Sequence, residues 1–221
     1  MSPLVAMSVS VPTIITAIII VVIRVSVTIS KTISIVRVVI STPRAKERIV
    51  EFDEGAVIAD TGVKLMGKLH QIFSGTVLTE DGDHIILDDT KAQFIKEHFK
   101  GKKIGIFYKF KSEWLMLKKV FGDDITDDLT EFTSSDKNIA LQMVSGREGI
   151  SLKDAEYLVF INIDFSAVTY FQAKDRMTTK DRKFNKIFWI FAENGIEAYI
   201  YKAVSNKKDF TLRLFKNVFS L

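Results

Sequence analysis

The sequence predicts an α/β protein with a parallel sheet covered by helices on both faces, preceded by a β-branched hydrophobic N-terminal extension. Two observations lead to this prediction. From about Thr42 onward, short apolar runs alternate with stretches of helical apolar spacing, as in strand–helix–strand units. Before Thr42 the chain is dominated by valine, isoleucine, serine and threonine. We therefore expect an extension over residues 1–41 and one domain over residues 42–221.

Helices are predicted where apolar residues recur at helical spacing and a glycine or a polar cap marks an end. Gly75, Gly101 and Gly122 are three of these stop signals. The predicted helices are Gly62–Phe73, Asp89–Phe99, Ser112–Phe121, Ser166–Met177, Gly195–Ser205 and Phe210–Phe219.

Strands are predicted where short apolar runs lack helical spacing. Two extended pieces lie within Gly75–Leu87, around the turn signal Glu80–Asp83. Longer buried strands are expected at Ile104–Phe110, Asn138–Val144, Tyr157–Ile163 and Lys186–Phe191. The acidic pairs Asp123–Asp124 and Asp127–Asp128 are expected in a solvated polar loop.

The extension supports three interpretations. Leu4–Ile23 is a run of 20 residues without a charge, and basic residues follow it, so it could span a bilayer and leave the C-terminal domain in the cytoplasm. Val25–Ile35 instead alternates apolar and polar residues as a soluble strand does, and Pro12 disfavours a helix. The segment could also be sequence upstream of the true domain start. These alternatives stay open.

Composition excludes several classes of function. Cysteine is absent, so disulfides and thiolate metal sites are excluded, and the three histidines have no metal-ligand spacing. Residues 1–50 hold six basic and one acidic side chain, for a net charge of +5, while the remainder holds 25 basic and 26 acidic, for a net charge of −1. Overall basicity is therefore no argument for nucleic-acid binding.

In a parallel sheet, function is expected in the loops that follow the strands. The loop Ser145–Leu152 follows a predicted strand and contains two glycines and two serines, which let a backbone approach phosphate. Further on, Gln172 and Arg176 are four residues apart and share one helical face, where a guanidinium could reach a transferring phosphate. Taken singly, the loop could be a tight turn and the helix face merely solvated.

Taken together and in this order, the two segments resemble motifs V and VI of superfamily 2 helicases, nearest to the Swi/Snf-like and phage DEAD/DEAH-type branch. Three further segments are similar in order to parts of the family's second motor domain. They are Lys68–Ile72 with Gly75, Ile104–Phe110, and Ile196–Val204 with the pair Lys207–Lys208. The resemblance covers roughly Thr42 to Phe219 and excludes the extension.

The resemblance implies a RecA-like C-terminal motor domain that closes over ATP bound to a first motor domain. Gly149, Ser151 and Gln172 would then contact the nucleotide. Arg176 would stabilise the transferring phosphate, and Arg182 could share this role, because Thr179 stands where the family often has its second arginine. The residues implied to contact the nucleic-acid backbone are Ser145, Gly146, Lys109 and Lys111.

The half of the site that would grip ATP is missing from the sequence. Gly101–Lys103 lacks the glycine spacing and the following Ser/Thr of a Walker A motif, and no acidic motif after a strand could hold Mg²⁺. ATP and Mg²⁺ would therefore be supplied mainly by a separate Walker A-bearing lobe, and the chain alone is expected to hydrolyse ATP negligibly. The implied partner is DNA, or alternatively RNA. The implied location is the cytoplasm, which for a phage protein is the cytoplasm of the host.

Two other classes of function fit the same sequence. One is a non-catalytic module that binds nucleic acid or a protein partner, has kept the fold, and is tethered to a membrane through residues 4–23. The other is an unrelated doubly wound enzyme that binds a phosphorylated small molecule at the Ser145 loop.

Overall fold

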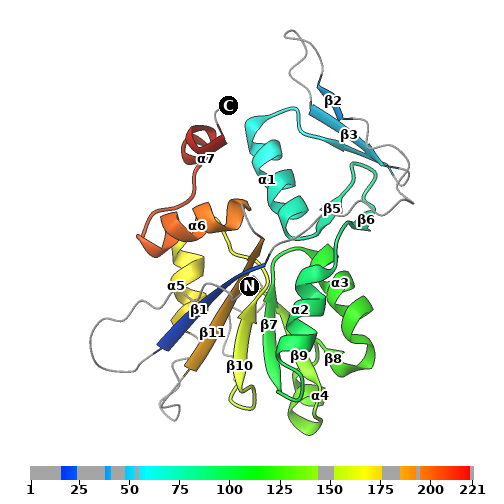
Figure 1. Ribbon diagram of the computed structural model, residues 1–221, viewed down its shortest axis with the longest axis vertical. Helices are drawn as coiled ribbons and strands as arrows, with labels where there is room; N and C mark the ends of the chain where they lie inside the picture. The colour runs from blue at the N-terminus through cyan, green and yellow to red at the C-terminus, as the bar shows by residue number, and fades with distance from the viewer. Residues whose placement is uncertain are drawn as a thin grey trace.

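The computed structural model describes residues 16–23, 38–40, 48–52, 55–143, 152–175, 185–192 and 195–219. Its main element is a six-stranded sheet in the order β1-β11-β10-β7-β9-β8, in which all neighbouring strands are parallel (Figure 1). The strands are β1 (Thr16–Ile23), β7 (Ile104–Tyr108), β8 (Ile125–Thr126), β9 (Asn138–Gln142), β10 (Tyr157–Phe160) and β11 (Asn185–Ala192).

The strand order reverses direction around β7. From β7 the chain continues to β8 and β9 on one side of that strand, and then crosses to β10 and β11 on the other side. The reversal places a topological switch point between β7 and β10, where parallel sheets usually bind ligands at the carboxyl ends of the strands. This is the α/β, RecA-like arrangement that the sequence predicts.

Helices cover both faces of the sheet (Figure 1). On one face, α2 (Thr90–His98) and α3 (Lys111–Phe121) pack on alternate strand residues such as Ile106 and Val159. On the other face, α4 (Leu129–Ser134), α5 (Ala167–Asp175) and α6 (Ile196–Ser205) pack on the intervening residues such as Phe107. The alternation follows from the pleat of a strand, and the two clusters form two hydrophobic cores.

Aromatic side chains fill the second of these cores. The ring of Phe160 stacks on Phe107 at 4.8 Å and on Trp189 at 4.1 Å, measured between ring centroids. Trp189 is 2% exposed, so these aromatics stabilise the sheet by burial rather than binding a ligand.

Two smaller antiparallel sheets accompany the main one. After α1 (Gly62–Phe73), β5 (Thr76–Leu78) and β6 (His84–Ile86) form the hairpin expected around Glu80–Asp83. Before α1, β2 (Val38–Ile40), β3 (Arg48–Phe52) and β4 (Gly55–Ile58) form a sheet that the sequence did not predict. The last helix among the described residues is α7 (Leu212–Phe219), which packs against α1.

The acidic pairs Asp123–Asp124 and Asp127–Asp128 are exposed, as expected, but the segment that holds them is more ordered than a loop. The segment contains the 3₁₀ turn η1 (Gly122–Asp124) and strand β8, and Asp128 caps α4 by accepting a hydrogen bond from the Glu131 N–H at 2.7 Å. A strand of two residues has no periodicity to detect, because it exists only through its pairing with β9.

The second part of the uncharged run forms a strand. Thr16–Ile23 pairs with β11 over its full length, from Thr16 opposite Asn185 to Ile23 opposite Ala192. No helix among the described residues has the length and apolar character needed to span a membrane. Val25–Ile35, with its predicted strand periodicity, lies outside the described residues.

Candidate functional site

The loops after β7 and β10 meet at the switch point and bring a charged pair together. Lys109 Nζ lies 2.8 Å from Asp164 Oδ2, and the two side chains are only 16% and 24% exposed. The ammonium also lies 4.5 Å from the centroid of the Phe165 ring, a cation–π contact. An ion pair therefore bridges the crevice in which a parallel sheet usually binds its ligand.

A fully buried carboxylate lies beneath this pair. Glu113, in the first turn of α3, accepts hydrogen bonds at Oε2 from the backbone N–H groups of Lys109 (2.7 Å) and Phe110 (2.8 Å). Its Oε1 accepts a hydrogen bond from Asn162 Nδ2 at 2.5 Å. Burial raises the pKa of the Glu113 carboxyl above its ordinary value, while the hydrogen bonds from Phe110, Asn162 and Lys109 oppose that shift.

His70, in the last turn of α1, is completely buried beside these loops. Its ring lies 5.4 Å from Phe110 and 4.8 Å from Phe165, between centroids. Neither ring nitrogen has a hydrogen-bond partner among the described residues. Burial lowers the pKa of His70 well below its ordinary value, and the positive charge of Lys109 lowers it further. The imidazole is therefore neutral at pH 7.

A second ion pair joins helices from opposite faces of the sheet. Lys91 at the start of α2 donates from Nζ to Glu197 Oε1 in the first turn of α6 at 2.6 Å, and their side chains are 2% and 0% exposed. The other carboxylate oxygen, Oε2, has no hydrogen-bond partner among the described residues. A Cβ on Gly195 would lie only 2.1 Å from that oxygen, so glycine leaves room for the carboxylate.

Carboxylates of the chain itself occupy the helix N-termini at this edge. Asp88 accepts from the Thr90 N–H at the start of α2 at 2.9 Å, and Asp209 accepts from the Ala167 N–H at the start of α5 at 2.8 Å. Glu113 takes the donors that precede α3, and α6 carries Glu197 in its first turn. Helix N-termini are the usual cradles for phosphate, and carboxylates of the chain already accept N–H groups at the starts of α2, α3 and α5. At these three helix starts, phosphate would have to displace a carboxylate of the chain itself.

Three of the nine predicted site residues lie within the described part of the chain. Lys111 is exposed at the start of α3, and Gln172 is exposed on α5. Lys109 lies at the switch point, but its ammonium is paired with Asp164 rather than free. The remaining six lie outside the described residues: Ser145, Gly146, Gly149, Ser151, Arg176 and Arg182.

The sequence analysis missed the buried polar residues His70, Lys91, Glu113, Asn162 and Glu197. For Glu113 a signal was present, because a glutamate at the third position of a helix is typical of a capping box. The other four are spread over three helices and a loop far apart in the sequence, and no local spacing connects them.

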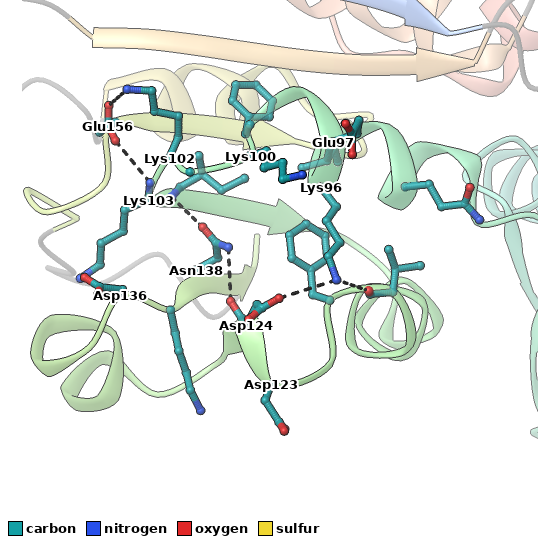
Figure 2. A pocket seen from close by; sticks show the side chains of 18 residues that line it. Lys96, Glu97, Lys100, Lys102, Lys103, Asp123, Asp124, Asp136, Asn138 and Glu156 are labelled. Carbon is teal, nitrogen blue, oxygen red and sulfur yellow. Dashed lines mark hydrogen bonds and ion pairs between the residues drawn. The ribbon is translucent and has the colours of Figure 1, made fainter.

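A pocket of about 960 Å³ lies at the opposite edge of the sheet, around the amino ends of β7 and β9 (Figure 2). Two of its lysines lie close to acids: Lys102 pairs with Glu156 at 3.0 Å, and Lys96 lies 3.6 Å from Asp124. Asn138 accepts from the Ile104 N–H and donates to the Asp124 carbonyl, joining the strand starts. These contacts hold structural elements together, and parallel sheets bind ligands at the other edge, so the pocket is not the candidate site.

Comparison with known proteins gives a structural likeness but no match of sequence family. No protein-family model matches the chain, and no curated protein matches it. Among solved structures, the chain is similar to the one described as "Crystal structure of the C-terminal part of Fun30 ATPase domain", with 18% sequence identity and a TM-score of 0.41. The match covers 55% of this chain and 44% of that chain, so the chain spans less than half the length of that relative. The fold assignment itself rests on the strand order.

Because His70 is buried and neutral, we expect it to make the protein less stable in acid. Its pKa is depressed in the folded state, whereas the unfolded chain binds a proton near pH 6.5, so stability is present above about 6.5 and is lost as the pH falls below it. The loss approaches about 1.4 kcal/mol per pH unit for one proton. Urea unfolding of the wild type and His70→Phe at pH 7, 6 and 5 should show a shallower decline in the variant; equal slopes would contradict this.

Proposed function

We propose that the chain is the C-terminal motor domain of an ATP-dependent nucleic-acid helicase or translocase, acting together with a separate lobe that carries Walker A. The observation that carries the proposal is the set of filled helix N-termini at the switch point. A domain that grips ATP phosphates needs such donors free. A domain that reaches toward ATP held by another lobe needs only exposed side chains.

The positions of the helicase-like segments support this division of roles. The segment Ser145–Ser151 comes after β9, which pairs with β7 in the sheet. Gln172 is exposed on α5, the helix that follows β10. In the proposed complex, Gly149, Ser151 and Gln172 contact the nucleotide, and Arg176 or Arg182 stabilises the charge on the transferring phosphate.

Nucleic acid, DNA or RNA, is proposed to lie along the Lys109–Lys111 loop, with Ser145 and Gly146 as further backbone contacts. Lys111 is exposed and can bind a phosphate directly. Lys109 must first give up its ion pair with Asp164 before it can bind a phosphate. Contacts of this kind are independent of base sequence and weaken with salt.

We expect the isolated chain to show no ATP hydrolysis above a protein-free control, with or without single-stranded DNA, duplex DNA or RNA. It should nevertheless bind a fluorescein-labelled oligonucleotide in low salt, and Lys111→Ala should lower the salt dependence by about one phosphate contact. Steady-state ATPase assays and fluorescence anisotropy over a salt series measure the two properties.

Lys100→Ala is the matched control, because Lys100 is also exposed but lines the pocket at the opposite edge of the sheet. It should leave oligonucleotide affinity unchanged. ATP turnover by the isolated chain on the order of 1 s⁻¹, as in complete enzymes, would refute the proposed division between two lobes. Equal effects of Lys100→Ala and Lys111→Ala would refute the proposed nucleic-acid surface.

A further inference from the structure

We propose that Glu113 and Asn162 form a buried clamp that positions Lys109 and Asp164 at the switch point. Lys109 is the residue for which we propose nucleic-acid contact, so the functional meaning of the clamp rests on the proposed function. Glu113 and Asn162 themselves are positioning residues, since both are fully buried and touch no solvent.

The Glu113 side of the clamp fixes the loop after β7. One carboxylate oxygen accepts two successive backbone N–H groups, those of Lys109 and Phe110, at 2.7 and 2.8 Å. Two charge-assisted hydrogen bonds on adjacent peptides fix the direction in which the Lys109 side chain leaves the backbone.

The Asn162 side fixes the loop after β10. Asn162 Oδ1 accepts a hydrogen bond from the Ile163 N–H at 2.7 Å, so the amide orientation is determined and Nδ2 must face Glu113. Two residues further on, Asp164 accepts from the Ser166 N–H through Oδ1 and holds Lys109 through Oδ2.

The backbone at Lys109 and the loop that carries Asp164 are therefore both linked to the carboxylate of Glu113, the first directly and the second through Asn162. If the Glu113–Asn162 contact is lost, each loop keeps its own chain connections but loses its buried link to the other. The buried pair Lys91–Glu197 differs in this respect, because it joins α2 to α6 and binds neither loop backbone. The placement of Lys109 thus depends on Glu113 and Asn162 in particular.

A charge-swap cycle tests the clamp. Glu113→Gln sets an amide donor against the Asn162 donor, and Asn162→Asp sets two carboxylates together, so each single variant breaks the contact. In the double variant, the glutamine amide can donate to the new aspartate while its oxygen still accepts from Lys109 and Phe110. The measurements are hydrogen exchange of the Lys109 and Phe110 amides and the Kd for a fluorescein-labelled oligonucleotide, under conditions in which every variant is folded.

We expect each single variant to speed exchange of the two amides by roughly tenfold or more and to weaken oligonucleotide binding, and the double variant to recover most of both. Phe132→Leu is the control for general loss of stability, since Phe132 is buried in the core on α4 and its carbonyl and ring contact Lys103 rather than Glu113 or Asn162. It should leave the Kd unchanged.

The possible outcomes separate the two proposals. The clamp is overturned if both single variants keep wild-type exchange and affinity, or if the double variant is no better than the worse single variant. If the exchange cycle holds but the wild-type chain binds no oligonucleotide in low salt, the clamp stands and the proposed nucleic-acid function fails.

Discussion

Lys91→Met is expected to lower the free energy of unfolding by about 3–5 kcal/mol. The substitution removes the ammonium that lies 2.6 Å from Glu197 Oε1. The Glu197 carboxylate, which is 0% exposed and already lacks a partner at Oε2, then has no cation to neutralise it. A buried charge without a partner retains its full desolvation cost, because no water replaces the lost contact. Guanidinium unfolding at pH 7, compared with the wild type, measures the loss.

Two further variants identify the cause of this loss. Lys91→Met combined with Glu197→Leu should recover most of the stability, because an apolar pair has no charge to desolvate. Lys64→Met breaks an exposed pair, Lys64 with Asp60 at 2.9 Å, and should change stability little because water screens that pair. If Lys91→Met and Lys64→Met have similar effects, burial does not determine the strength of the inner pair.

Gly75→Ala is expected to lower the free energy of unfolding by roughly 3 kcal/mol or more, from backbone strain and overpacking together. Gly75 has a φ of +89°, and a Cβ there would lie 2.2 Å from the backbone oxygen of Asp88. Asp88 cannot move away freely, since its N–H and that of Leu87 both donate to the Gly75 carbonyl, at 3.0 and 2.8 Å. Thermal or urea unfolding of the variant measures the cost.

Gly82→Ala is the matched control for Gly75→Ala. Gly82 has a similar φ of +95°, but nothing lies within 4 Å of the position of its Cβ. This variant should therefore lose only the strain of a positive φ, about 1 kcal/mol. If the two variants lose the same free energy of unfolding, the close approach to Asp88 does not contribute to the effect of Gly75→Ala.

The sequence predicted best those elements whose own residues show a clear hydrophobic periodicity. Gly62–Phe73 was predicted with the boundaries that α1 has, and the helix predicted over Ser112–Phe121 differs from α3 by one residue at its start. Both have an apolar face of at least three turns and a glycine shortly after the last residue. The small elements β8 and α4 were missed because two and six residues are too short to show a period.

The candidate site was predicted less completely. Placing Lys109 at the carboxyl end of a central strand follows from the strand pattern, and the structure places it at the switch point. That its ammonium is bound by Asp164 could not be predicted, because the two residues are 55 positions apart and meet only when β7 and β10 pair. The implied contacts of Gly149, Ser151, Arg176 and Arg182 remain predictions.

By itself, then, the sequence determined the alternation of strands and helices, the position of Gly75 as a helix stop, and the loops in which function is expected. These properties depend on the order of residues along the chain, through the periods of helix and strand and the backbone freedom of glycine. Only the tertiary structure decided that Glu113 and Asn162 join two loops, that Lys91 and Glu197 pair across the sheet edge, and that Gly75 meets Asp88. The strength of these contacts comes from burial, which no residue has until the distant parts of the chain pack together.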